Sequence, residues 1–350
     1  MSAKSIASRK KGRRKIDKVG GKLMEENNEK VLSFRQLRGD FFGEHISPDR
    51  LWHYTSAQGL NGIIQDNGKM RLFFTRSDCL NDYSEGNDVL KCYHESCSRL
   101  WKTGRIDDSF YQVIKDLEVP EFRRLKYRIP DPDLGSIPLV LFDEVKCDVY
   151  ICCFSMKEDS LDMWRYYSKS DGGYALGLCT NLFYDEAKTD PAGICSWIGA
   201  CRVIYSTEEK IALLSEKIVR VYSAFLNDKE VEDPRNMAKL VLQSHLECFQ
   251  YQFKHECFSS EQEYRFLIYL PHTIPDQVHQ DLPHVSFRTS NGVVVPYIEC
   301  EIENGNDNLF SVMISPYISE KQAEATTRDF LKSRGFSKCD VTKSALPVRF

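Results

Sequence analysis

The segment Glu261-Gln262-Glu263-Tyr264-Arg265 constrains the fold of this chain most, because it runs directly into the apolar, β-prone residues 266–270. Alternate residues of a strand point to opposite faces, so Glu261, Glu263 and Arg265 are predicted to share one face. Three adjacent ionisable groups are costly to bury unless they pair or face water, so the pattern indicates a site that lines a cleft. The alternative is a solvated strand edge whose charges discourage pairing with other chains.

Short strands and helices precede this segment. Residues 51–55 read as an aromatic and β-branched strand that carries His53, and Ser56 is placed to cap a helix after it. Further strands are predicted at 70–75 and 148–154. A strand, a short aromatic helix and a glycine-flanked strand are therefore expected around residues 148–177.

Several short motifs occur in one order along the chain. They are His53-Tyr54, Leu80-Asn81-Asp82 with Glu85, Cys153-Phe154-Ser155, Met163-Trp164-x-x-Tyr167, Gly173 with Gly177, Val203-x-Tyr205, Glu261-x-Glu263-x-Arg265 and Ser344-x-x-Pro347-x-Arg349. Each is weak alone, but the ordered set is specific. From Leu51 to Phe350 the chain resembles the bacterial family catalogued as domain of unknown function 2971.

That family resembles ADP-ribosyltransferases, which place a histidine on the first strand, a tyrosine at a later strand-helix junction and a glutamate on a late strand around NAD. The resemblance implies that His53, Tyr167 and Glu263 hold these positions. Spacing leaves open which of Tyr166, Tyr167 and Tyr174 faces the ligand. The long inserts between the elements depart from the family pattern.

The residues also make chemical sense for that reaction. Nicotinamide leaves NAD through a ribosyl cation, which a carboxylate such as Glu263 stabilises as the charge develops. Glu261 would orient a nucleophile or accept its proton, and the neighbouring like charge would raise one of the two pKa values. His53, the third expected catalytic residue, would hold a ribose hydroxyl.

The residues that the resemblance implies for NAD binding are His53, Tyr54, Thr55, Trp164, Tyr167 and Arg265. Tyr167 would stack on the nicotinamide, and Arg265 would orient the carboxylates or meet a phosphate. We expect NAD as a substrate and no metal. The chain has no Gly-rich phosphate fingerprint, so neither a Rossmann nor a P-loop site is supported.

Composition favours an intracellular protein without a membrane anchor. No apolar run approaches the length that spans a bilayer, and the basic N-terminus has no apolar stretch of a secretory signal. The 13 cysteines include no CxxC pair and no zinc spacing, so we expect reduced core thiols and a cytoplasmic location.

Charge is divided unevenly along the chain. Residues 1–22 carry a net charge of +8, which leaves −12 for the remainder. Residues 1–30 are therefore expected to form a disordered basic tail, which would either only solvate the chain or contact nucleic acid weakly.

The remainder, 31–350, is predicted to be a single α+β domain with a mixed, mostly antiparallel, ADP-ribosyltransferase-like sheet core. Helical insertions are expected near 83–142 and 206–256. Asp82-x-x-Glu85 and Ser206-x-x-Glu209 are typical capping boxes, and Asp233-Pro234 would open a further helix.

Three functions remain open from the sequence. The first is an NAD-using ADP-ribosyltransferase-like enzyme, a toxin or defence effector with a macromolecular acceptor. The second is a non-catalytic module that binds a nucleotide or a protein, in which Glu263 and Arg265 only form an ion pair. The third is a metal-dependent nuclease, which would require Asp78, Asp82 and Glu85 to converge on Glu261.

Overall fold

The computed structural model describes residues 33–34, 48–80, 87–121, 123–129, 139–168, 172–180, 182–183, 198–274, 282–290, 292–319 and 321–348. The expected basic tail, the Asp82-x-x-Glu85 capping box, Asn81 and Arg349 lie outside these residues. Residues Leu32–Phe350 form one compact unit.

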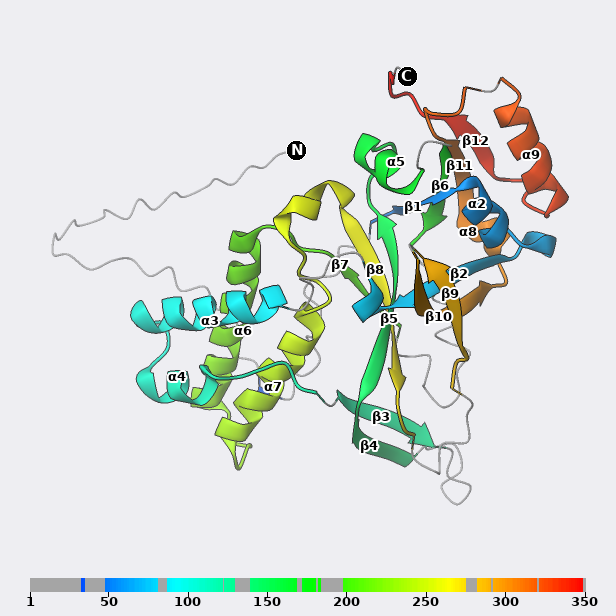
Figure 1. Cartoon of the computed structure of the whole chain (residues 1–350). Coiled ribbons are helices and arrows are strands. Elements are labelled where there is room, and N and C mark those ends of the chain that lie inside the picture. Colours follow the sequence, from blue (N-terminus) through cyan, green and yellow to red (C-terminus); the bar gives the residue numbers. More distant parts are fainter. Residues whose placement is uncertain are drawn as a thin grey trace, which may run out of the picture. The chain divides into compact units, whose positions relative to one another are not determined.

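A large open sheet runs through this unit (Figure 1). Its strands are β1 (Arg50–Ser56), β2 (Met70–Arg76), β5 (Cys147–Ser155), β6 (Gly173–Cys179), β7 (Ile198–Arg202), β8 (Glu263–Pro271), β9 (Val285–Ser290), β10 (Val293–Ile302), β11 (Leu309–Ile314) and β12 (Asp340–Lys343). The order is β12-β11-β6-β1-β5-β2-β10-β9, with β8 on β5 and β7 on β8. Among the described strands β11 and β12 pair in parallel and the other pairs are antiparallel, which confirms the predicted α+β class with a mostly antiparallel sheet.

The pairing of β5 with β8 is the longest in this sheet and fixes the register around the charged segment. It runs from Cys147 opposite Pro271 to Ser155 opposite Glu263. Both strands are apolar over most of their length, as expected for strands that are covered on both faces. The other edge of β5 is shared by β1, which pairs at Ser155, and by β2, which pairs at Tyr150 and Ile151.

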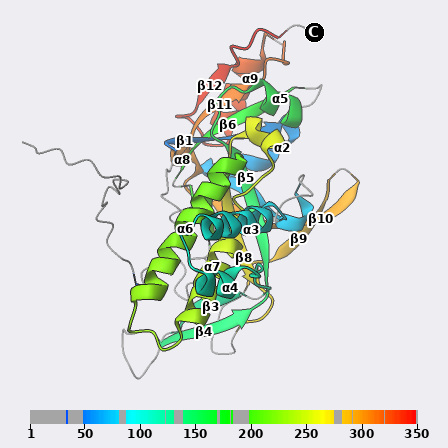
Figure 2. The same cartoon turned by 90° about the vertical axis from the view of Figure 1, so that its left-hand side faces the viewer.

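Helices α3 (Asn87–Lys102), α4 (Asp108–Ile114), α6 (Thr207–Asn227) and α7 (Pro234–Phe249) share one apolar core, and α3, α6 and α7 lie close together in both views (Figures 1 and 2). As predicted, the Ser206 hydroxyl accepts the Glu209 N–H at the start of α6, and Asp233 caps α7 with Pro234 in its first turn. In the described part of the chain, no helix has the length and apolarity that a bilayer span requires.

The first insertion differs from the helical segment that was expected. After α3 and α4, strands β3 (Arg123–Ile129) and β4 (Leu139–Val145) form a separate two-stranded antiparallel sheet. From Leu125 to Ile129 apolar and charged residues alternate with period two, which is the pattern of a strand. The expectation of a helical insert up to residue 142 missed this alternation.

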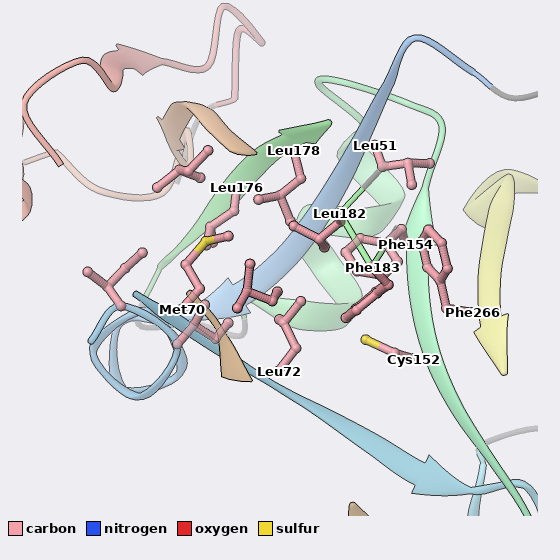
Figure 3. Close-up of a cluster of buried hydrophobic side chains, with 14 of the residues drawn as sticks. Leu51, Met70, Leu72, Cys152, Phe154, Leu176, Leu178, Leu182, Phe183 and Phe266 are labelled. Carbon is pink, nitrogen blue, oxygen red and sulfur yellow. The ribbon is translucent and has the colours of Figure 1, made fainter. Parts of the chain in front are cut away.

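The two faces of the large sheet carry different cores. One face holds the larger cluster, in which Phe154 and Phe266 lie next to each other and Leu176 and Leu178 belong to the same core (Figure 3). The opposite face holds a smaller aromatic cluster around Trp52, with α5 (Leu161–Tyr167) packed against it. Successive strand residues alternate between these two environments.

The C-terminal segment is attached to the loop that precedes α5. One Asp159 carboxylate oxygen accepts from Trp164 Nε1 at 2.6 Å and from the Ser344 hydroxyl at 2.8 Å, and the other accepts from the Ala345 N–H at 3.0 Å. Ser344 of the terminal motif therefore fixes the helix that carries Tyr167. The remaining helices, α2 (Ala57–Ile63), α8 (Gly305–Asn308) and α9 (Ala323–Ser333), follow β1, β10 and β11 in the chain.

Candidate functional site: a buried carboxyl pair

The charged segment does not begin on a strand, contrary to the sequence prediction. Glu261 ends the 3₁₀ helix Glu256–Glu261, and β8 begins only at Glu263. Gln262 between them has φ 44°, in the left-handed region, which turns the chain. Period-two alternation therefore relates only Glu263 and Arg265, and the turn brings Glu261 to them.

All three charged groups are buried, so they do not line an open cleft as predicted. Glu263 is 4% exposed and Arg265 is 0% exposed. A second cation, Lys254, makes this burial tolerable, because its Nζ lies 2.8 Å from Glu261 Oε2 and also contacts Glu263 Oε1. Arg265 Nε lies 2.6 Å from Glu263 Oε2 and its Nη1 donates to the Tyr251 carbonyl at 3.0 Å. Two carboxyl groups and two cations thus satisfy one another.

Several of the short motifs meet at this pair. The Ser155 hydroxyl of Cys153-Phe154-Ser155 donates to the Glu261 carbonyl at 2.7 Å. The Tyr205 hydroxyl of Val203-x-Tyr205 accepts the Glu263 N–H at 2.8 Å, and the Val203 N–H donates to the Glu263 carbonyl at 2.9 Å. These main-chain bonds hold both ends of the turn, so the side chains of the pair are preorganised.

The two carboxyl groups are hydrogen-bonded to each other, and their pKa values move apart. Burial, followed by the bond to Glu263, raises the pKa of Glu261 to about 7. Burial opposes ionisation of Glu263 too, but Arg265, Glu261 and Lys254 together hold its pKa well below the usual range. Near neutral pH the pair therefore contains one ionised carboxylate and one carboxyl group that can gain or lose a proton.

A pH dependence of stability follows from Glu261. Between pH 4.5, its ordinary pKa, and about 7, folded Glu261 retains a proton that the unfolded chain has released. Its contribution is therefore complete below pH 4.5 and is lost as pH rises towards 7. Between pH 4.5 and 7 the free energy of unfolding of the wild type should therefore fall by about 1–3 kcal/mol because of Glu261. We expect this fall to be absent from Glu261→Gln, and urea denaturation at several pH values measures it.

The control is Glu303→Gln, on an exposed carboxylate that pairs with Lys69. His53 also affects the pH dependence, because burial lowers its pKa and its contribution to stability rises with pH over the same range. The test therefore compares the pH slope of the free energy of unfolding in the variant with the slope in the wild type. Identical slopes for Glu261→Gln and wild type would contradict the assignment.

The structure selects Tyr167 among the three candidate tyrosines. Tyr166 is 56% exposed, whereas Tyr174 packs against the larger core on the other face of the sheet. Tyr167 is half-buried in the aromatic cluster, and burial, followed by the charge of Glu261, raises its pKa. Its phenol therefore interacts with the charge of the carboxyl pair, and α5 packs against the 3₁₀ helix that ends at Glu261.

His53 lies on the face of the sheet opposite to Glu263. Trp52 is opposite Ser155 and Ser155 is opposite Glu263, so these three side chains share a face and His53 points the other way. Its ring lies 5.4 Å from the Phe154 ring, and its Nδ1 is 3.2 Å from the Cys153 carbonyl. The expectation that His53 and Glu263 open into one pocket is wrong, because the register between β1, β5 and β8 separates them.

The other residues expected around NAD are held by protein contacts. The Tyr54 hydroxyl donates to the carbonyls of Lys157 and Glu158 and accepts the Ser160 N–H, while its ring packs 4.8 Å from that of Trp164. Trp164 is completely buried. Thr55 shares the face of His53, with its hydroxyl next to Gly59 of α2. Arg265 is enclosed with Glu263, so no phosphate reaches it in this arrangement.

A cavity of about 320 Å³ lies next to the carboxyl pair. Its wall includes Gln262, the residue between the two glutamates, and Tyr205, which binds the Glu263 main chain. Arg202 and Glu209 form an ion pair on another part of the wall. Tyr205 therefore joins the cavity wall to the main chain of Glu263.

Within the described ranges, no group of three or more His, Cys, Asp or Glu side chains could hold a metal ion. Asp78, expected in the nuclease alternative, pairs with Arg76 Nε at 2.7 Å, and Asp82 and Glu85 lie outside the described residues. Every cysteine that the structure describes is a free thiol, but only some of them are core residues as predicted: Cys92, Cys97, Cys152, Cys201 and Cys248 are buried, whereas Cys257 is exposed.

Sequence reasoning missed Lys254, which holds both carboxyl groups. It follows a helix in an otherwise unremarkable segment, so no motif marks it. The sequence of the charged segment contained one signal. It has two glutamates and a single arginine, so if both glutamates are buried, as they are, a second cation is needed to pair with them.

Fold and site define a mixed α+β protein with a buried, paired carboxyl site on a mostly antiparallel sheet. Residues 163–266 match the model of a family described as a protein of unknown function, DUF2971, which confirms the resemblance for this segment. The segment begins in α5, ends one residue after Arg265, and contains Tyr167, Tyr205 and Lys254. Neither a curated protein nor a solved structure gives a match.

Proposed function

We propose that the protein is an NAD-using enzyme of the ADP-ribosyltransferase type, with the Glu261–Glu263 pair acting on the ribosyl group. The observation that carries the proposal is the pair itself. Two neighbouring carboxyl groups whose pKa values are driven apart are the usual basis for separate acid-base and charge-stabilising roles. Tyr167 lies beside them, and all three residues fall in the segment that matches the family.

In this proposal Glu263, ionised at neutral pH, stabilises the positive charge that develops on the ribose as nicotinamide leaves. Glu261, with its pKa near neutrality, takes the proton of the attacking nucleophile. Tyr167 offers an aromatic surface to the nicotinamide. His53 has no role here, because it lies on the other face of the sheet.

The proposal requires a defined route for the substrate. Because Glu263 is 4% exposed, NAD would have to reach the pair from the cavity, whose wall includes Tyr205 and Gln262. A macromolecular acceptor, a role as toxin or defence effector and a cytoplasmic location belong to the proposal through the family resemblance. The basic tail, with nine Lys and Arg in residues 1–22, would add a salt-dependent contact to nucleic acid.

One observation favours a second function, a non-catalytic module that binds a nucleotide or a protein. Both oxygens of the Glu263 carboxylate are already occupied, Oε1 by Lys254 and Oε2 by Arg265. A carboxylate that is satisfied in this way can hold neighbouring segments together without taking part in a reaction. Binding of a ligand without turnover would favour this function.

NAD binding tests the proposal, and the chain offers a matched pair of variants. Tyr167→Leu removes the aromatic surface beside the carboxyl pair and is expected to weaken NAD binding about 3- to 10-fold by calorimetry. Tyr166→Leu changes the adjacent ring, which points to solvent, and should leave the affinity unchanged. Equal effects of both variants would remove Tyr167 from the site, and a wild-type protein that neither binds NAD nor releases nicotinamide would favour the second function.

A further inference from the structure

The main chain of Lys254 is held on both sides. Its N–H donates to the Ile204 carbonyl at 3.2 Å, in a short bridge that pairs Ile204 with Phe253. Its carbonyl accepts from Lys210 Nζ at 2.8 Å. The peptide from which the Lys254 side chain extends to the carboxyl pair is thus fixed by a charge-assisted bond from another lysine.

Lys210 is an unusual residue for such a bond, because it is a lysine in the first turn of α6 that is only 1% exposed. Its ammonium also pairs with Asp88 Oδ2 of α3 at 2.8 Å and lies 5.6 Å from the centre of the Phe253 ring. The carboxylate, the carbonyl and the aromatic face together replace the water that this ammonium loses on burial.

We infer that Lys210, supported by Asp88, is a positioning residue that sets the place of the Lys254 ammonium against the Glu261–Glu263 pair. Lys210 bonds to the main chain of the residue whose own ammonium contacts both carboxyl groups. Through this connection the packing of α3 against α6 determines where a cation sits in the site. The catalytic importance of this positioning rests on the proposed function, which gives the carboxyl pair its chemical role.

The simpler alternative is that Lys210 only joins α6 to α3. Such a role would need the pair with Asp88 alone, which could form at the surface without the cost of burial. The additional bond to the Lys254 carbonyl is what the positioning role explains. The two roles differ in what they do to the carboxyl pair, so the titration of the pair separates them.

Besides Lys254, Arg265 of β8 acts on the titration of the pair. Tyr167 of α5 and Tyr205 after β7 interact electrostatically with both carboxyl groups, and Cys153 of β5 interacts with Tyr167. Cys201 of β7 lies near Glu263 and Arg265. None of them contacts Lys210 through an interaction described above, so a change at Lys210 reaches the pair through Lys254.

The test follows the side-chain carboxyl resonances of ¹³C-labelled glutamate against pH in the full chain, with Glu261→Gln identifying the pair. Lys254→Met sets the scale, because removing the cation should raise the apparent pKa of the pair by about 1 unit or more. Lys210→Met keeps Lys254 but removes its anchor, and we expect a rise of the same sign and smaller size. Asp88→Asn, a milder change, should move the titration in the same direction.

Lys217→Met is the matched control, because Lys217 is also a buried lysine of α6, at 3% exposed. It should lower stability without moving the titration of the pair. If Lys210→Met and Asp88→Asn both titrate as Lys217→Met does, the positioning role is wrong and Lys210 only stabilises packing. The readout needs no NAD, so a failure of the proposed function leaves this result interpretable.

Discussion

Arg265→Met is expected to lower the free energy of unfolding by about 3–5 kcal/mol. The side chain is completely buried, and its loss leaves Glu263 with one cation instead of two and the Tyr251 carbonyl without its guanidinium donor. Methionine fills much of the same volume, so the expected loss comes from the missing ion pair and hydrogen bonds of buried polar groups rather than from a cavity. Chemical denaturation of both proteins at pH 7 measures it.

Arg99→Met is the control for this experiment. Arg99 pairs with Glu95 at 2.7 Å one helical turn away, but its side chain is 58% exposed, so the same substitution should cost no more than about 0.5 kcal/mol. Comparable losses for the two variants would show that the Glu263–Arg265 pair is no more important than a surface pair. The network would then not account for the stability of this part of the sheet.

Glu263→Gln is expected to reduce nicotinamide release from NAD by about two orders of magnitude or more, as when one preorganised charge stabiliser is removed. The amide retains the size of the side chain but removes the negative charge. Because Lys254 and Arg265 both contact Glu263, we expect this variant to be less stable as well. Turnover therefore has to be compared at a temperature where circular dichroism shows both proteins folded.

Glu261→Gln separates the two carboxyl roles in the same assay. Its proposed role is towards the nucleophile, so it should reduce transfer to an acceptor more than hydrolysis of NAD. Glu303→Gln, on an exposed carboxylate, should change neither. If folded Glu263→Gln turns over NAD as fast as the wild type, Glu263 does not stabilise the charge of the ribose, whatever the effect of Glu261→Gln.

Local sequence signals predicted most of the elements that carry the site. Apolar, β-prone runs gave β5 and β8, and the caps Ser206 and Asp233 gave the starts of α6 and α7. These signals depend on neighbouring residues alone. The β3–β4 hairpin was missed because its alternation is short and follows two real helices.

The ordered motifs also identified the correct region before any contact was known. Ser155, Tyr205 and the Glu261–Glu263 segment belong to three separate motifs, and the structure joins them, because the Ser155 hydroxyl donates to the Glu261 carbonyl and the Tyr205 hydroxyl accepts the Glu263 N–H. The order of motifs along the chain does not reveal which side chains share a face. The structure places Tyr167 in the aromatic cluster on the face that Glu263 shares and His53 on the opposite face, and the role of Tyr167 stays a prediction.

The sequence by itself determined the α+β class, the charged entry to β8 and the family resemblance, because each depends on residue types at short spacing or in a fixed order. Only the tertiary structure decided that His53 faces away from Glu263, since a shift of one residue in the register of β1 against β5 would have reversed it. It also supplied Lys254, whose ammonium reaches the pair from a segment outside the strand. Burial determines the protonation of Glu261, and burial arises only when distant segments pack together.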